Sequence, residues 1–392
     1  MKKMYKINKM GLLPFILVAI VLGIVCGMFF PKWLAQIFVT FNGLFSQFLG
    51  FIIPLLIFGL VSPAISNIGS KAGKMLLITV IIAYGNTLLS GFYAYSISDV
   101  FFPSMVEKYN FDSSAEGNVL SPFFTIAIPP IMGVMSALVL SFVMGLVLAH
   151  YPNSMLKQVL DDFQLVIVKV IEKVIIPLLP IYIYGIFLEM SFNGTVYHIL
   201  SVFAKIIGVI FLAHVVLLIL QYVVAGLVVK KNPFKLLTTM LPAYFTALGT
   251  QSSAATIPVS LAQTLKNGVK KEIADFVIPL CATIHLSGST MKIVMCALAL
   301  MLVQGIPYNF GLFAGFICML GVTMVAAPGV PGGAIMAALA VLNSILGFDE
   351  NMQALMIALY IAMDSFGTAC NVTGDGAIAL VVNKILGKKS ED

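Results

Sequence analysis

Long apolar stretches dominate the chain, and their lengths predict membrane-spanning helices. An α-helix needs about 20 apolar residues to cross the hydrocarbon core of a bilayer. The first six stretches meet or exceed this length, and they cover residues 11–30, 39–66, 75–98, 119–149, 163–189 and 197–229. The pattern therefore predicts an all-α polytopic membrane protein whose first six transmembrane helices are these stretches.

Beyond residue 230, two apolar segments are interrupted at their centres. The segment 234–268 is flanked by lysines at both ends, and its centre, Leu248 to Thr256, is small and polar. Lysines at both ends place both ends in the cytoplasm, which predicts a re-entrant helical hairpin. The segment 307–347 repeats this form around a centre rich in glycine and proline, Ala327 to Gly333. We expect two oppositely oriented hairpins.

The lysines also predict the orientation of the chain. They cluster after every second stretch, whereas the intervening 99–116 loop carries four acidic residues and one lysine. Because cytoplasmic loops are rich in lysine, both termini are expected in the cytoplasm and the protein in the cell inner membrane. Spans at 272–303 and 351–383 bring the count to eight. The order hairpin, span, hairpin, span indicates inverted repeats, which are typical of secondary transporters.

Composition excludes several classes of protein. The 392 residues are 60% hydrophobic and 10% charged, whereas soluble domains are about one quarter charged. A soluble domain, a disordered chain and a nucleic-acid binder are therefore excluded. All 22 basic residues are lysine, so no guanidinium can hold a carboxylate through two parallel hydrogen bonds. The five cysteines lie in apolar stretches without metal-ligand spacing, and we interpret them as packing residues.

The last predicted span carries four polar side chains on one stripe. Asp364, Thr368, Asn371 and Asp375 follow the spacing i, i+4, i+7, i+11, which places them on one helical face. Ionisable groups within a span cost about 2.5–3.5 kcal/mol each on insertion scales, so they indicate function. Their oxygens suit a small cation and the ammonium of a ligand. The stripe therefore predicts a binding cavity.

The preceding span carries a second polar set that includes Ser287. Its members His285, Ser289 and Lys292 share one face by the same spacing. A histidine close to a mid-span lysine is a candidate for handling protons or charge. His214 has no polar partner on its own helix face and receives no role.

These motifs together resemble the dicarboxylate/amino acid:cation symporter family, the glutamate-transporter homologues. The motifs are the sequence Asn-Val-Thr-Gly-Asp ending at Asp375, the hairpin tip Gln-Ser-Ser at 251–253 followed by Thr-Ile-Pro, Pro-Leu-Cys-Ala-Thr-Ile at 279–284, and Gly-Val-Pro-Gly at 329–332. The resemblance covers the C-terminal half in order. The six N-terminal spans fit the family plan by hydropathy alone.

The resemblance implies an elevator-type homotrimer in which a scaffold holds a mobile transport domain. On that plan residues 1–74 and 119–190 form the scaffold, and residues 75–98 and 197–388 form the transport domain. The implied partners are a small-molecule substrate, membrane lipid and two further copies of the chain, with no nucleic acid. The protein is expected not to be an enzyme and to use Na+ or H+ but no organic cofactor.

The resemblance also implies roles for single residues. Asp364 matches the carboxylate that binds the substrate's amino group, and Asn371 and Thr368 match the groups at its α-carboxylate. Asp375 with Asn371 matches one sodium site, to which His285 is a weaker candidate ligand. The hairpin residues that match the substrate site are Ser252, Ser253, Val330 and Gly332.

The chain departs from the family at positions that bear on the substrate. Members that carry acidic substrates have arginine where this chain has Gly367 and Gln251, and a serine where it has Ala254. The family's Asn-Met-Asp-Gly-Thr reads His-Leu-Ser-Gly-Ser at 285–289, so two ligands of a second sodium site are replaced.

Two main hypotheses follow. The first is a symporter that couples Na+ or H+ entry to uptake of a small, neutral amino acid, because Asp364 is retained while the partner of a second carboxylate is missing. The alternative is an acidic amino acid or C4-dicarboxylate, with Lys292 in place of the arginine. Asp375 favours sodium, whereas His285 and Ser287 favour fewer sodium ions or a proton.

Two remote alternatives are an intramembrane aspartyl protease and a channel. A protease dyad needs facing carboxylates about 3 Å apart, but Asp364 and Asp375 lie three turns apart on one predicted helix. The hairpin gates argue against a continuous pore.

Overall fold

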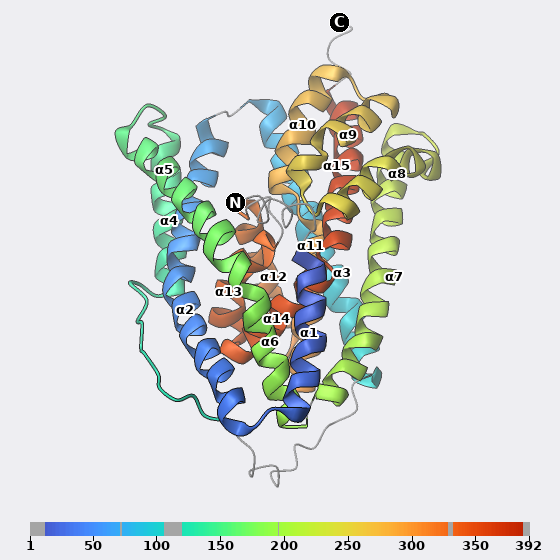
Figure 1. Ribbon diagram of the computed structural model, residues 1–392. Helices are drawn as coiled ribbons and strands as arrows, with labels where there is room; N and C mark the ends of the chain where they lie inside the picture. Colours follow the sequence, from blue (N-terminus) through green and yellow to red (C-terminus); the bar gives the residue numbers. More distant parts are fainter. Residues whose placement is uncertain (1–11, 71–72, 106–119, 195, 328–331, 387–392) are drawn as a thin grey trace, which may run out of the picture.

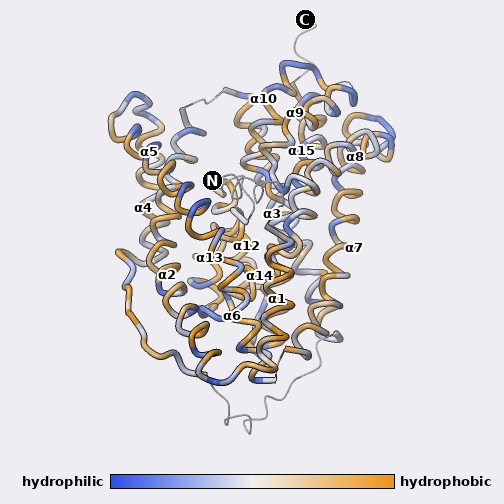
Figure 2. The backbone as a smooth tube through the Cα atoms, in the orientation of Figure 1, coloured by the Kyte–Doolittle hydropathy of each residue, from blue (hydrophilic) through white to orange (hydrophobic). Residues whose placement is uncertain are grey.

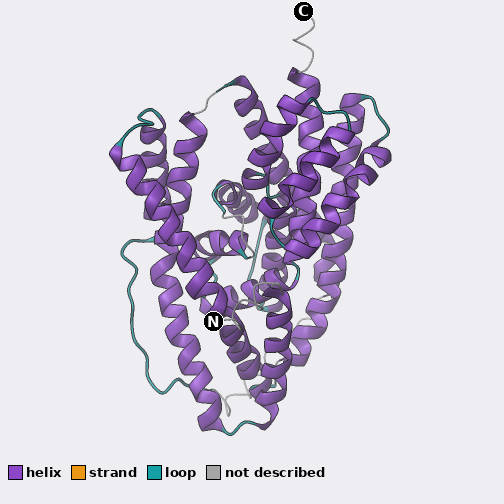
Figure 3. Cartoon of the chain, turned by 45° about the horizontal axis from the view of Figure 1, so that its top comes forward, coloured by secondary structure: helices purple, strands orange, loops and turns teal. Residues whose placement is uncertain are grey.

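The computed structural model describes residues 12–70, 73–105, 120–194, 196–327 and 332–386, and every regular element in them is helical (Figures 1 and 3). The elements are α1 (Leu12–Phe29), α2 (Lys32–Ser70), α3 (Lys74–Met105), α4 (Val134–Ala149), α5 (Met155–Val170), the π-helix η3 (Ile171–Ile175), α6 (Ile176–Phe192), α7 (Val196–Val229), α8 (Pro233–Thr250), α9 (Ser253–Lys266), α10 (Lys271–Ile284), α11 (Ser287–Val303), α12 (Phe310–Val325), α13 (Gly333–Leu346), α14 (Glu350–Ala362) and α15 (Asp364–Leu386). The all-α prediction is confirmed for these residues.

The helices form two groups with a third set between them (Figure 1). On one side α2 packs against α4 and α5. On the other side α15 packs against α7, α8, α9 and α10. The helices α11 to α14 lie between the two groups, and α11 is buried along its whole length apart from Leu302. A helix that is enclosed on all sides lies at the centre of the molecule.

Several helices are long and apolar enough to cross a membrane. Among the described residues these are Lys32–Asn67, Lys74–Met105, Phe203–Val229 and Lys271–Val303. The pair α14 and α15 adds a fifth if it is counted as one span, with a bend of 63°. Figure 2 shows hydrophobic shafts in α1, α4 and α7 and hydrophilic ends on α5, α8, α9 and α10. The chain is therefore a membrane protein.

The predicted span 119–149 is wrong in its first half. Residues 120–133 are extended rather than helical, and α4 begins only at Val134. The physical reason is the local sequence, since a proline at 122 and a proline pair at 129–130 remove backbone donors and clash with a helix. The extended segment runs beside α2 (Figure 1), where Phe123 N donates to Thr40 Oγ1 at 2.9 Å.

Two predicted continuous spans are interrupted within their length. The span predicted at 272–303 breaks at His285 and Leu286, between α10 and α11. The span predicted at 351–383 bends at Met363, between α14 and α15. Each interruption leaves backbone groups without partners in their own helix. These breaks are where the polar side chains gather.

The two interrupted segments each fold as a pair of short helices that pack on each other, α8 with α9 and α12 with α13. At the first tip Gln251 has a left-handed backbone with φ +52°, and the side chain of Ser252 accepts a hydrogen bond from Ala255 N. At the second tip Gly332 has φ +75° and precedes α13. Val330, predicted at this tip, lies outside the described residues.

Candidate functional site

Both hairpin tips reach the first turn of α15. Gly332 N donates a 2.8 Å hydrogen bond to Asp364 Oδ2. Gln251 Nε2 donates to Ser365 Oγ at 3.3 Å. Three segments that are far apart in the sequence therefore meet at two consecutive residues, and the site is built around them.

The predicted polar stripe lies on one helix. Asp364, Thr368, Asn371 and Asp375 all belong to α15, and each side chain is buried. Because the helix is continuous from Asp364 onward, the sequence spacing does place them along one face. The two carboxylates have different neighbours, and they form two separate clusters.

The first cluster joins Asp364 to Lys292 of α11. Lys292 is completely buried, and its Nζ lies 3.5 Å from Asp364 Oδ1. The ammonium also donates to the carbonyl oxygen of Tyr360 at 3.2 Å and lies 3.4 Å from the centroid of that ring. A cation over an aromatic face is stabilised by the ring quadrupole.

Gly367 has no side chain that would fill the space next to the Lys292 ammonium. A Cβ atom at this position would lie 3.0 Å from Lys292 Nζ and 3.5 Å from Ser289 Oγ. A contact of 3.0 Å is tighter than nearly all real Cβ contacts. The position at which the resemblance implies an arginine in acidic-substrate members is therefore, in this chain, a glycine that directly adjoins a lysine ammonium.

Asn371 holds the break between α10 and α11. Its Oδ1 accepts hydrogen bonds from Gly288 N at 2.8 Å and Ser289 N at 3.3 Å. Its Nδ2 donates to Ser289 Oγ at 3.0 Å, and Tyr360 OH donates to the same oxygen. An amide oxygen that accepts from the first free N–H groups of a helix acts as a cap. Asn371 thereby ties the start of α11 to α15.

The second cluster surrounds Asp375. His285 Nδ1 lies 2.8 Å from Asp375 Oδ1, and His285 Nε2 lies 2.9 Å from Asn86 Oδ1 of α3. Gln221 Nε2 of α7 donates to Asn86 Oδ1 at 2.7 Å and to Ser287 Oγ at 3.1 Å. Four helices thus contribute to one buried chain of hydrogen bonds, in which the imidazole sits against the carboxylate.

Some buried oxygens on the helices that form these clusters have no hydrogen-bond partner. Within the described residues the buried atoms Gln221 Oε1, Thr290 Oγ1 and Thr373 Oγ1 are unpaired. Buried polar atoms are normally satisfied, and neutral oxygens are ligands that suit hard cations. The described residues contain no group of three or more His, Cys, Asp or Glu side chains that could hold a metal ion.

Five residues of the site were missed from the sequence: Asn86, Gln221, Tyr360, Ser365 and His214. His214 is buried, and its Nε2 lies 3.2 Å from the carbonyl oxygen of Gly288, so it does have a polar partner on another helix. The sequence could have indicated Asn86 and Gln221 as site residues, because an amide in the middle of an apolar stretch is costly to bury without a hydrogen-bond partner. The partner of Tyr360 and that of His214 depend on packing between helices.

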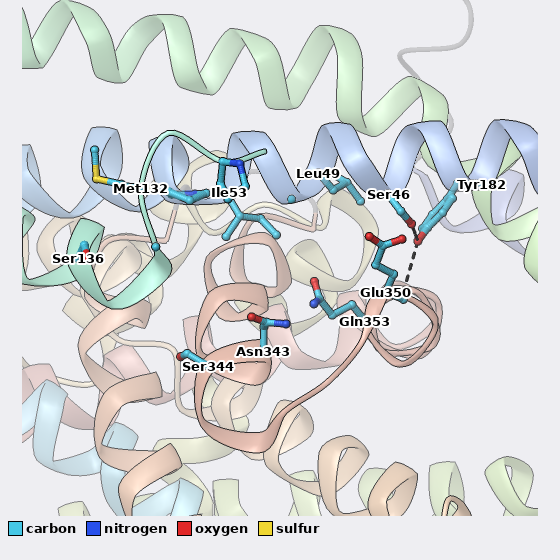
Figure 4. Close-up of a pocket in the computed structure, with 14 residues that line it drawn as sticks. Ser46, Leu49, Ile53, Met132, Ser136, Tyr182, Asn343, Ser344, Glu350 and Gln353 are labelled. Atoms are coloured by element: carbon cyan, nitrogen blue, oxygen red, sulfur yellow. Dashed lines mark hydrogen bonds between the residues drawn. The ribbon is translucent and has the colours of Figure 1, made fainter. Parts of the chain in front are cut away.

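Two cavities lie beside α2, and neither is lined by Asp364 or Asp375. One of about 730 Å³ is lined by α2, α5 and α10 and reaches both hairpins at Ala254 and Ala326. The other, of about 450 Å³, lies between α2 and α6 on one side and α13 and α14 on the other (Figure 4). There Ser46 Oγ and Tyr182 OH are 2.8 Å apart, and Tyr182 OH donates to the carbonyl oxygen of Glu350 at 3.5 Å.

The sequence of the chain matches one known protein family. Residues 12–385 match the model of the sodium:dicarboxylate symporter family. The chain belongs to this family. It is therefore a membrane transporter and not an enzyme, and membership of the family implies coupling to sodium.

Three individual relatives have sequences similar to this chain. The chain is 27% identical to the serine/threonine transporter SstT of Acinetobacter baumannii over 387 residues, which cover 94% of this chain and 95% of the relative. It is 25% identical to the SstT of Acinetobacter baylyi, covering 96% and 98%. Over 204 residues it is 31% identical to excitatory amino acid transporter 1 of Rattus norvegicus, covering 51% of this chain and 37% of that protein.

Proposed function

We propose that the protein couples sodium entry to the uptake of a small, neutral amino acid. The observation that carries this proposal is the pairing of Asp364 with Lys292 beside Gly367. The two charges cancel, so a zwitterion with no net charge enters a neutral cluster. An acidic amino acid would bring one further negative charge into a buried site, which is strongly unfavourable without a cation to pair with it.

We expect different parts of the site to bind the ammonium group and the α-carboxylate of the substrate. Asp364 accepts the ammonium group, as the resemblance implies, while Thr368 and Asn371 lie one and two turns further along α15. Helices α9 and α13 begin at the two tips, at Ser253 and Gly333. The positive end of a helix favours an anion, so the N-termini of α9 and α13, next to Ser252 and Gly332, favour the α-carboxylate.

The coupling site is proposed at the second cluster. Sodium is the family's cation, and the unpaired oxygens of Gln221, Thr290 and Thr373 suit it. His285 already takes one oxygen of Asp375, so a sodium ion at that oxygen must displace the ring. We expect fewer coupled sodium ions than the full family motif supports, and coupling to H+ is the alternative.

The domain plan is proposed on the same basis. Residues 1–74 and 119–190 would form the scaffold, and residues 75–98 and 197–388 the transport domain of an elevator. The plan has eight spans, two re-entrant hairpins, cytoplasmic termini and a homotrimer. The cavity of Figure 4 supports it, because that cavity lies between α2 and α6 on one side and α13 and α14 on the other, along the proposed boundary.

An acidic amino acid or C4-dicarboxylate is the second candidate. It is favoured by one observation, the placement of Lys292 Nζ beside Gly367, the position at which the resemblance implies an arginine in members that carry acidic substrates. The pairing with Asp364 argues against it, because this pair has no net charge and an acidic substrate would add a negative charge to it.

A binding screen separates the candidates. The purified protein is heated with a panel of amino acids and dicarboxylates, each with sodium and with choline instead. We expect serine, threonine and alanine to raise the unfolding temperature in sodium. Stabilisation by aspartate, glutamate or succinate alone would contradict the neutral substrate, and stabilisation that is the same in choline would contradict sodium coupling.

A further inference from the structure

Lys292 pairs with the carboxylate that the proposed function assigns to the substrate. Its Nζ lies 3.5 Å from Asp364 Oδ1, and the lysine side chain is fully buried. Among the described residues this is the only ion pair that Lys292 makes. The buried lysine and the substrate's amino group thus need the same partner.

The ammonium of Lys292 has a second set of contacts that does not depend on Asp364. The carbonyl oxygen of Tyr360 accepts from Nζ at 3.2 Å, and the ring of Tyr360 faces it at 3.4 Å. Gly367 leaves the space around Nζ free of a side chain. The lysine can therefore release Asp364 and still be held as a cation.

Asp364 cannot serve two ammonium groups equally well. Two like charges about 4 Å apart repel strongly where water is excluded. When the substrate's amino group pairs with Asp364, Lys292 must therefore loosen its own pairing. The two cations compete for one carboxylate.

The same carboxylate also holds the second hairpin. Asp364 Oδ2 accepts from Gly332 N at the tip that precedes α13. An ionised aspartate buried without a cation is strongly disfavoured. With Lys292 paired to it, Asp364 stays compensated, and the hairpin tip stays docked on α15 without any substrate.

We propose that Lys292 is a tethered counter-cation. It occupies Asp364 in the empty carrier, gives way to the amino group of the substrate, and returns when the substrate leaves. The empty carrier can then reorient across the membrane with its second hairpin closed and without a second solute. This inference rests on the proposed function, in which Asp364 binds the amino group.

Net uptake and exchange in proteoliposomes test the proposal. Net uptake of labelled serine into vesicles without internal serine requires the empty carrier to return, whereas exchange into vesicles preloaded with serine does not. For Lys292→Met we expect net uptake to fall at least tenfold more than exchange. Lys292→Arg should restore most of the wild-type ratio of net uptake to exchange. Lys205 is exposed on α7, and Lys205→Met should leave this ratio at the wild-type value.

Equal losses of net uptake and exchange in Lys292→Met, or an unchanged ratio, would overturn the proposal. If Lys292→Met does not reconstitute, Lys292→Gln keeps a donor for Tyr360 without the charge and carries the same expectation. Serine binding to the purified variant gives a second readout. We expect binding as tight as in the wild type or tighter, because a competitor is removed, and a tenfold weakening would contradict this.

Different results would overturn the proposed function and the role of Lys292. If wild-type protein neither binds nor transports serine, threonine or alanine, the proposed function is wrong. If wild-type uptake is normal but Lys292→Met keeps its ratio of net uptake to exchange, the counter-cation is wrong and the proposed function stands.

Discussion

At the scale of single residues, specificity centres on the space shared by Gly367 and Lys292. A side chain at 367 begins 3.0 Å from the lysine Nζ, so the two positions cannot be changed independently. Gly367→Arg alone should abolish serine transport, because it places a guanidinium beside an ammonium. The double variant Gly367→Arg with Lys292→Met removes that repulsion and supplies the fork that a second carboxylate needs.

For this double variant we expect aspartate to compete for exchange at least tenfold better than it does in the wild type. The measurement is inhibition of labelled-serine exchange by aspartate and by alanine. An unchanged aspartate inhibition would show that position 367 does not face the substrate's side chain.

His285 makes a second prediction at this scale. Changing His285→Asn and Ser287→Asp together removes the ring from Asp375 and restores the family residues at both positions. We expect uptake to depend more steeply on sodium concentration and to saturate at lower sodium. The control is His150→Asn, an exposed histidine at the end of α4. Sodium dependence that does not change would place the coupling site elsewhere.

The sequence predicted the members of the site better than their partners. The stripe from Asp364 to Asp375 follows from helical spacing, and α15 confirms that these residues share one helix. The contact of Lys292 with Gly367 joins α11 to α15, and that of His285 with Asn86 joins the α10–α11 break to α3. Such contacts depend on how helices pack, which spacing within one helix does not contain.

At the scale of elements, the second hairpin depends on a glycine conformation. Gly332 has φ +75°, and a Cβ there would meet nothing closer than 4.0 Å, so alanine would cost backbone strain alone. That strain is about 1–2 kcal/mol. Gly347, at the other end of α13, has φ +71° and open space around it, which makes it a matched control.

We expect Gly332→Ala and Gly347→Ala to lower the unfolding temperature by similar amounts. Serine affinity should fall about fivefold or more in Gly332→Ala alone, since about 1.4 kcal/mol corresponds to a factor of ten and this tip contacts Asp364. Titration of both variants with serine measures the difference. Equal affinities would mean that the tip does not help to close the site.

The sequence predicted elements where composition changes sharply and failed where only geometry decides. Lysines and a polar centre identified the α8–α9 segment, and glycines and prolines identified α12–α13. The prolines in 120–133 indicated that this segment is not helical, but its high hydropathy led to the prediction of a span. The breaks at His285 and Met363 lie in stretches that are apolar enough to be predicted as continuous helices. Contacts between helices, such as that of Asn371 with Gly288 N, stabilise these breaks.

At the scale of the whole molecule, the elevator proposal requires α14 to move relative to α2. Gln47 Nε2 donates to Glu350 Oε1 at 3.2 Å across this boundary. Cysteines at both positions, in a background without the five native cysteines, should cross-link with mercury and stop transport until a thiol is added. Gln36 and Ser121 lie within the proposed scaffold, where Gln36 Nε2 donates to the carbonyl oxygen of Ser121, and serve as the control pair.

Cross-linking of the control pair should leave transport intact. Continued transport by protein that is fully cross-linked between residues 47 and 350 would exclude movement along this boundary.

The central claim, uptake of a small, neutral amino acid, is tested most directly by initial rates in proteoliposomes under an inward sodium gradient. Labelled serine and labelled aspartate are compared at equal concentration in the same preparation. We predict sodium-dependent serine uptake at least a hundred times faster than aspartate uptake, since one unpaired buried charge costs about 3 kcal/mol or more. Aspartate uptake equal to or faster than serine uptake would contradict it.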